Sequence, residues 1–267
     1  MNAPHPAPLV LSERSGAVLR LTLNRPGARN ALSEGLMSAL QTALDEAAAD
    51  KALRVIVLGA DGPAFSAGHD LKEMTARRKD ADRGNAAFAA LFAQCSKLMQ
   101  TIMRHPRPII AQVQGIATAA GCQLVASCDL AVASSAARFA TPGVNIGLFC
   151  STPMVALSRN VSRKAAMEML LTGEMISAED AYRIGLVNRV VAPTELLAAT
   201  TKLAELIASK PSKTVKIGKE AFYRQLEMGL SEAYEYASQV MTTNTLAAEA
   251  EEGIGAFVEK REPNWPD

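Results

Sequence analysis

The 267-residue chain has few aromatic residues, few histidines and almost no excess charge of either sign. It carries 28 Lys and Arg against 27 Asp and Glu, so the formal net charge at neutral pH is +1. Nucleic-acid-binding proteins usually have a basic face and a high isoelectric point, and a value near 7.7 argues against that class. We therefore expect no nucleic-acid partner. Because aromatics make up only 4% of the chain, the core must consist mainly of Ala, Leu, Val, Ile and Met.

Long apolar runs and cysteine frameworks are also missing. The most apolar stretch, residues 109–140, is interrupted by Asp129 and Arg138, so no run reaches membrane-spanning length. The first residues, MNAPHPAPL, lack the layout of a signal or transit peptide. The cysteines form neither a CxxC pair nor a disulfide framework; they are Cys95, Cys122, Cys128 and Cys150. These patterns predict reduced thiols, a cytoplasmic location, no membrane association and a flexible tail over residues 1–8.

The order of the hydrophobic patterns predicts the fold class. Strands are expected as a pair over 9–23 and at 55–58, 109–113, 130–133 and 138–140. Helices are expected over 32–47, 88–103, from a capping box at Ser177 to Gly185, and over 194–209 and 213–252. Strands and helices alternate to about residue 140 and helices dominate afterwards. This order indicates an α/β core followed by a helical C-terminal region.

Several catalytic motifs can be excluded by inspection. The sequence has no GxxxxGK[ST], no GxGxxG after a strand, no GxSxG and no HExxH. Its histidines are His5, His69 and His105, without the clustered carboxylates of a catalytic zinc site. We therefore expect no metal and no dinucleotide cofactor.

Two segments have the same construction of buried strand, small-residue turn and expected helix start. The first runs from Gly62 to Lys72 after strand 55–58, and the second from Gly115 to Leu124 after strand 109–113. Unpaired N–H groups and the positive dipole end of a helix stabilise developing negative charge. Two such turns side by side would form an oxyanion hole with two donors. Tight packing alone also explains small residues here, and spacing by itself favours that explanation, because small-residue turns are common in α/β folds.

Five ordered segments resemble the enoyl-CoA hydratase/isomerase (crotonase) family over nearly the whole chain. They are Asn24–Leu32, Ala64–Glu73, Pro108–Asp129, Phe139–Pro142 and Glu252–Arg261. The run Thr141–Pro153 is most similar to one subgroup, the enoyl-CoA hydratase domain-containing proteins.

The resemblance implies an α/β fold in which a crotonase-like spiral of ββα turns spans residues 9–200. It further implies that the helices of 201–267 form a trimer or a dimer of trimers. In such a protein the N–H groups of His69 and Ala120 bind the carbonyl of an acyl-CoA thioester, and CoA enters as part of the substrate, with no separate cofactor. The implied substrate contacts are Arg25, Ala67, Gly68, His69, Asp70, Leu71, Lys72 and Gly121, with Phe257 and Lys260 reaching the CoA of a neighbouring subunit.

The sequence departs from the family at both hydratase carboxylates. Family hydratases add water with two glutamates, whose positions here hold Gln123 and Gly143. An amide cannot exchange a proton near neutral pH, so ordinary hydration should be very slow. A malonyl-type decarboxylase needs no strong base, and a thioesterase needs a water that Gln123, Ser151 or Asn145 could orient. A double-bond isomerase needs one acid or base, and Ser151 stands where dienoyl-CoA isomerase relatives carry an aspartate, which argues against that reaction. A non-catalytic acyl-CoA-binding protein needs neither an acid nor a base.

Other side chains are considered for the missing chemistry. We expect catalytic contributions from Gln123 and Ser151, beside the oxyanion donors His69 and Ala120. The His69 imidazole either titrates in the pocket or points to solvent beside Asp70. Asp129 fits a structural role at a helix-to-strand turn.

Overall fold

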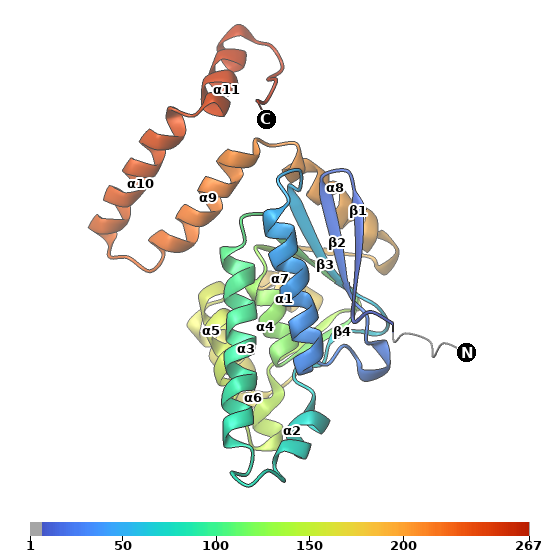
Figure 1. The fold of residues 1–267 in the computed structure, drawn as a ribbon. Helices are drawn as coiled ribbons and strands as arrows, with labels where there is room; N and C mark the ends of the chain where they lie inside the picture. The colour runs from blue at the N-terminus through green and yellow to red at the C-terminus, as the bar shows by residue number, and fades with distance from the viewer. Residues whose placement is uncertain (1–6, 267) are drawn as a thin grey trace.

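The computed structural model describes residues 7–266, so most of the tail expected at 1–8 lies outside the described residues. Its larger sheet has the strand order β1-β2-β3-β5-β7-β10 (Figure 1). These strands are β1 (Val10–Ser15), β2 (Val18–Leu23), β3 (Val55–Ala60), β5 (Ile109–Val113), β7 (Leu130–Ser134) and β10 (Arg189–Val191). β1 and β2 pair antiparallel, as the pattern of 9–23 predicts, and the other pairs in this sheet are parallel.

A smaller sheet has the order β4-β6-β8-β9. Its strands are β4 (Ala64–Ser66), β6 (Ile116–Thr118), β8 (Arg138–Ala140) and β9 (Ile176–Ser177). Three consecutive strand pairs, β3–β4, β5–β6 and β7–β8, each send the first strand to the larger sheet and the second to the smaller sheet. Each such step adds one turn to a spiral, which confirms the predicted crotonase-like architecture.

Helices cover both faces of the larger sheet. The helices of the described residues are α1 (Glu34–Ala49), α2 (Leu71–Arg77), α3 (Asn85–Arg104), α4 (Ala120–Ser127), α5 (Ser151–Asn160), α6 (Arg163–Thr172), α7 (Ala178–Arg183), α8 (Leu196–Ala208), α9 (Ser212–Gln225), α10 (Leu230–Thr245) and α11 (Ala248–Glu259). Strand β3 is buried on both sides, as its continuous apolar run predicts. Ile56 and Leu58 belong to the main core with α1 and α3, whereas Val55 and Val57 pack against α8.

The sequence predicts a boundary at residue 200 between the spiral and the C-terminal helices, but this residue lies inside α8. Leu196, Leu203 and Ala204 of this helix are buried against the sheet, so α8 is part of the core. The projecting region begins at α9, and α9, α10 and α11 extend away from the two sheets (Figure 1). The sequence predicts one helical stretch over 213–252, but the chain turns after Gln225 and after Thr245 to give separate helices.

One buried ion pair joins α9 to the core. The Lys219 ammonium lies 2.7 Å from the Asp129 carboxylate, and the Tyr223 hydroxyl donates to the same carboxylate at 3.0 Å. Asp129 also accepts the Ile109 N–H at 2.7 Å, where α4 gives way to β7. The structural role that the sequence predicts for Asp129 is confirmed. Within residues 7–266 no helix is long and apolar enough to cross a membrane.

Candidate active site

The two glycine turns pack directly against each other. A Cβ placed on Gly68 would lie 2.9 Å from the Ala119 Cβ and 3.3 Å from the Ala120 nitrogen. A Cβ placed on Gly121 would lie 2.2 Å from the Ser66 carbonyl oxygen. Only glycine at both positions allows this approach, so the first turn, at the end of β4, meets the start of α4.

The two expected oxyanion donors, the N–H groups of His69 and Ala120, take no part in the hydrogen bonds of the neighbouring bridge and helix. Leu32 pairs with His69 in an isolated parallel bridge, and its N–H donates to the Gly68 carbonyl at 2.7 Å. In a parallel pair, the hydrogen bonds of one residue go to the two neighbours of the residue opposite it. Those of Leu32 therefore go to the neighbours of His69, and the His69 N–H points away from Leu32. Ala120 is the first residue of α4, so its N–H has no intrahelical acceptor.

The backbone of the second turn is strained. Ala119 has φ 50° and ψ −119°, a region that residues with a Cβ rarely adopt. Its N–H donates to the Ala140 carbonyl at 2.9 Å, which ties the turn to β8. Strain of this kind costs about 1–3 kcal/mol and persists where the surroundings fix the conformation.

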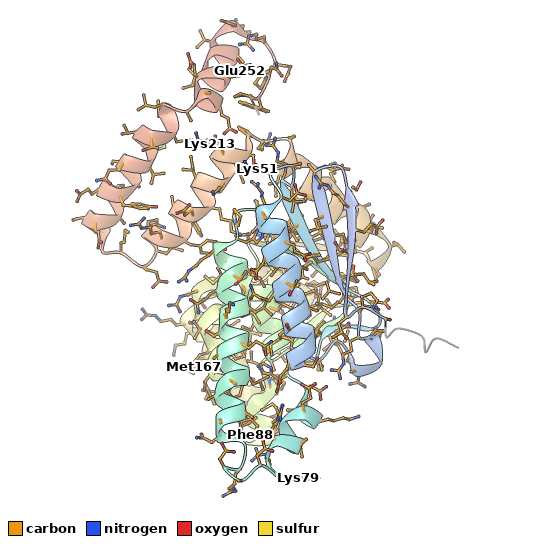
Figure 2. The ribbon with its side chains drawn as sticks, viewed as in Figure 1. Lys51, Lys79, Phe88, Met167, Lys213 and Glu252 are labelled. Atoms are coloured by element: carbon orange, nitrogen blue, oxygen red, sulfur yellow. The ribbon has the colours of Figure 1, made fainter. Side chains whose placement is uncertain are left out.

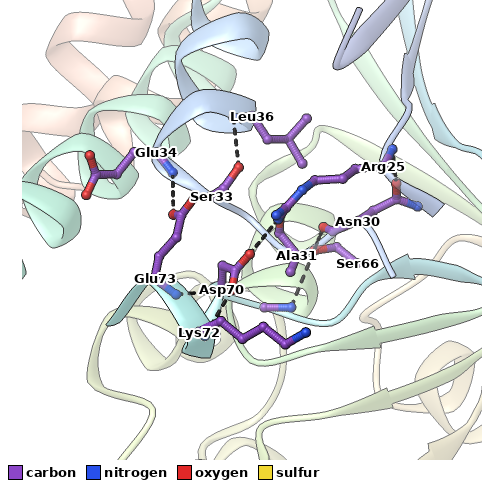
Figure 3. A network of polar contacts seen from close by, with 11 residues as sticks. Arg25, Asn30, Ala31, Ser33, Glu34, Leu36, Ser66, Asp70, Lys72 and Glu73 are labelled. Carbon is purple, nitrogen blue, oxygen red and sulfur yellow. Dashed lines mark hydrogen bonds and ion pairs between the residues drawn. The ribbon is translucent and has the colours of Figure 1, made fainter. Parts of the chain in front are cut away.

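Arg25 and Asp70 bind each other beneath the first turn (Figure 3). The guanidinium lies 2.6 Å from the carboxylate, which also accepts the N–H groups of Lys72 and Glu73 and so caps α2. Burial alone would raise the pKa of Asp70, but Arg25 and these N–H groups together hold it below its ordinary value. The side chains of this pair fix the start of α2.

Asn30 joins the loop that follows β2 to the first turn, and its sequence position alone does not indicate this role. Its amide donates to the carbonyls of Asp61 and Ala64, and its oxygen accepts the Arg25 N–H, all at 2.8 Å. The Ser66 hydroxyl donates to the Asn30 carbonyl at 2.8 Å. A positive φ of 49° at Asn30 makes this arrangement possible, and asparagine is one of the few residues that tolerate it.

The remaining first-turn residues form an open rim. Leu71 and Lys72 are exposed at the start of α2, and the Lys72 side chain points into the space beside the small sheet (Figure 3). Ala67 is half-buried, and its N–H donates to the Arg29 carbonyl at 3.0 Å, so only its carbonyl side remains for a ligand.

The His69 ring is inside the protein, so the solvent-facing alternative is wrong. Both ring nitrogens are buried, and the ring meets Phe92 of α3 edge-to-face with centroids 5.5 Å apart. Burial lowers the pKa of His69. The nearby Leu32 carbonyl raises that pKa by a smaller amount, although it does not meet the geometry of a hydrogen bond to the ring. Phe92 has no recognisable signal in the sequence beyond its place in an apolar stripe.

Gln123 lies on α4, one turn from Ala120, and its amide oxygen lies 3.9 Å from the Cys95 sulfur. It is 5% exposed and lines a cavity of about 830 Å³ between α3, α4, α5 and α9. Met99, Met103 and Val155 supply apolar walls, and Tyr223 contributes from α9. The structure therefore brings Gln123 into an apolar cavity next to the second turn.

The second carboxylate position is closed. A Cβ on Gly143 would lie 2.6 Å from the Leu148 carbonyl oxygen and 2.9 Å from the Cys150 sulfur. The φ of Gly143 is not positive, so backbone approach and not conformation excludes a side chain there.

Ser151 and Asn145 do not join Gln123. The Ser151 side chain is exposed, its hydroxyl donates to the Phe149 carbonyl at 3.3 Å, and it does not line the cavity. The Asn145 amide nitrogen lies beside Gly173 at the end of α6. The cavity at Gln123 therefore gives no support to a catalytic role of Ser151, which stays a prediction.

Phe257 and Lys260 lie far from the first turn of the same chain. Phe257 lies on α11 and Lys260 directly follows it, and Figure 1 shows α11 at the end of the molecule opposite α2, the helix that follows the first turn. Phe257 is 84% exposed, so it is available to a neighbouring chain.

The cysteines are poor nucleophiles. All four are free and buried, and burial raises the pKa of Cys95 and of Cys122 to about 12. Residues 7–266 contain no group of three His, Cys, Asp or Glu side chains placed to hold a metal ion.

Relatives of known sequence cover nearly the whole chain. Enoyl-CoA hydratase domain-containing protein 3, mitochondrial, from Rattus norvegicus is 48% identical over 263 residues, which are 98% of this chain and 86% of the relative. The protein of that name from Homo sapiens is 49% identical over 93% of this chain and 80% of its own length. These mitochondrial names contradict the predicted cytoplasmic location. Reduced thiols could not have decided this, because they fit any reducing compartment.

Solved structures share the fold throughout. An enoyl-CoA hydratase from Mycobacterium smegmatis has a TM-score of 0.92 and 53% identity, covering 97% of this chain and 99% of its own. Human enoyl Coenzyme A hydratase domain-containing protein 3 has a TM-score of 0.91 and 47% identity, covering 96% and 100%. The family described as enoyl-CoA hydratase/isomerase matches residues 13–267. With its spiral fold and paired glycine turns, the chain belongs to the enoyl-CoA hydratase/isomerase family.

Proposed function

We propose that the protein binds acyl-CoA thioesters and stabilises the enolate oxygen with the N–H groups of His69 and Ala120. The observation that supports this proposal best is the close approach of Gly68 to the Ala120 nitrogen, since it brings the turns of the two proposed donors together. A positioned oxyanion donor typically contributes about 3 kcal/mol to a transition state. Backbone donors keep that contribution although both family glutamates are replaced.

The reaction we propose is an enolate-forming reaction other than ordinary hydration. Gln123 can hold a substrate atom or a water but cannot transfer a proton. The space beside Gly143 is filled by the Leu148 carbonyl and Cys150, so no second carboxylate fits without movement of the loop. Thioester hydrolysis is less well supported, because neither Ser151 nor Asn145 lines the cavity beside Gln123.

The substrate enters, in this proposal, along the open rim of the first turn. CoA would lie over Ala67, Leu71 and Lys72, where an exposed ammonium can meet a phosphate. The acyl group would pass the two N–H donors toward the apolar cavity at Gln123 and Met99. Phe257 and Lys260 would reach this rim from a second chain in a trimer.

Binding and enolate formation can be tested together with acetoacetyl-CoA. Calorimetry should detect binding, and the ultraviolet absorbance of the enolate should increase when protein is added at fixed pH. Coenzyme A without an acyl group, as the control ligand, should bind without an enolate signal. Absence of a calorimetric signal with millimolar acetoacetyl-CoA would contradict the proposal.

A further inference from the structure

The imidazole of His69 is a buried polar group near the Leu32 carbonyl, but without a hydrogen bond of good geometry in the part of the chain that the structure describes. Neither ring nitrogen has a hydrogen-bond partner among residues 7–266, and both are buried. An unsatisfied buried polar group costs about 1–3 kcal/mol, so its presence beside a ligand site requires an explanation. The edge-to-face contact with Phe92 holds the ring in one orientation.

The ring belongs to the residue whose N–H is one of the two proposed donors, and it packs against α3. Phe92, Cys95 and Met99 follow one face of α3 at spacings of three and four residues. Phe92 contacts the His69 ring, Cys95 contacts Gln123, and Met99 lines the cavity. The imidazole, the amide of Gln123 and the apolar cavity therefore lie along a single helix face.

We propose that the His69 imidazole is the base that removes the α-proton of the bound acyl-CoA thioester. The inference rests on the enolate-stabilising function proposed above. The α C–H bond breaks, its proton moves to a neutral ring nitrogen, and its electron pair forms the C=C bond of the enolate. The negative charge falls on the thioester oxygen, which the N–H groups of His69 and Ala120 hold. The imidazolium then returns the proton to the α-carbon, or to the γ-carbon of an unsaturated acyl group, so the reaction class is double-bond isomerisation.

Other groups near the site are unsuited to this step. The Asp70 carboxylate is bound to Arg25, and Asp129 is bound to Lys219 and Tyr223. The Cys95 thiol on α3 has its pKa raised to about 12 by burial. Glu73 accepts the Glu34 N–H at 3.1 Å, at the start of α1. Burial lowers the pKa of His69, so its ring is neutral and able to accept a proton at neutral pH.

The decisive measurement is deuterium incorporation at the α-carbon of butyryl-CoA in D2O, followed by mass spectrometry. The wild-type protein should catalyse this exchange, with a rate that has already levelled off at about pH 6.5, because the lowered pKa of His69 leaves the imidazole neutral there. His69→Ala and His69→Gln retain the backbone donor, so both should still bind acetoacetyl-CoA, with a Kd that calorimetry measures separately from the exchange rate. Their exchange rates should fall at least about 100-fold.

Phe92→Leu separates packing from proton transfer, because it removes the edge-to-face contact and keeps the base. It should lose less than about tenfold in exchange rate. If His69→Gln exchanged within about threefold of the wild-type rate, the inference would be overturned. A wild-type protein that binds acetoacetyl-CoA but does not exchange would also overturn it. Both outcomes would leave the proposed function standing. A wild-type protein that does not bind acetoacetyl-CoA would instead overturn the proposed function itself.

Discussion

Gly121 in the first turn of α4 lies against the Ser66 carbonyl at the end of β4, and a Cβ on Gly121 would approach that oxygen to 2.2 Å. This contact holds the two proposed oxyanion donors at their separation. Gly121→Ala should therefore push the turns apart, destabilise the fold by about 1–3 kcal/mol and abolish the enolate signal with acetoacetyl-CoA.

Gly218 of α9 is the matched control, because a Cβ there meets nothing within 4 Å. Gly218→Ala should stabilise the protein by about 1 kcal/mol, since Ala is the better helix former, and should keep the enolate signal. Urea unfolding and the enolate absorbance check both variants. Equal behaviour of the two variants would contradict the role of the contact.

Lys219 and Asp129 should contribute strongly to stability. The ammonium is 7% exposed and the carboxylate 15%, so Lys219→Met leaves an almost buried carboxylate without its cation. We expect a loss of about 3–5 kcal/mol in urea unfolding. Lys216→Met, at an exposed position of the same helix, should change stability by no more than about 0.5 kcal/mol. Similar losses in both variants would show that the buried pair is not important.

The two described histidines should make stability depend on pH. Burial lowers the pKa of His69 and of His105 below the ordinary value of 6.5. The unfolded chain therefore binds more protons than the folded chain below about pH 6.5, so the free energy of unfolding rises with pH through that range. His69→Gln should weaken this slope relative to the wild type in urea titrations between about pH 5 and 7.5. An unchanged slope would mean that the His69 pKa is not lowered.

Hydration of crotonyl-CoA should be slower than in a family hydratase with both glutamates by several orders of magnitude. Each missing proton-transfer group is worth about 10²–10⁴-fold. Gln123→Glu should raise the hydration rate, and Gln123→Leu should not. Adding Gly143→Glu should destabilise the loop, because the Leu148 carbonyl occupies the Cβ position. Normal hydration by the wild-type protein would mean that another group transfers the proton.

The projecting helices should form the subunit interface. Leu230, Tyr234 and Leu246 of the α10 region are 70–83% exposed, and large exposed apolar surfaces usually mark interfaces. Light scattering should give at least three times the chain mass of 28.3 kDa. Leu246→Asp should weaken the assembly, whereas Lys79→Asp, at an exposed position at the opposite end of the molecule (Figure 2), should not. A monomeric wild-type protein at micromolar concentration would exclude this interface.

The sequence by itself determined the elements with strong local patterns. The continuous apolar runs of β3 and β5 and the helical stripes of α1 and α3 identify these segments, since burial imposes their periodicity. The small residues of the two turns, together with the family resemblance, also indicated the site. The short strands β4, β6, β9 and β10 contain at most three residues each, too few to show a period.

Only the tertiary structure decided how these parts meet. The approach of Gly68 to Ala120, the closed space at Gly143 and the pairing of Lys219 with Asp129 join residues that lie 5 to 90 positions apart. The orientation of the His69 ring depends on Phe92 of α3 in the same way. Sequence patterns report whether a residue is buried. Which groups it contacts depends on the packing of segments distant in the chain.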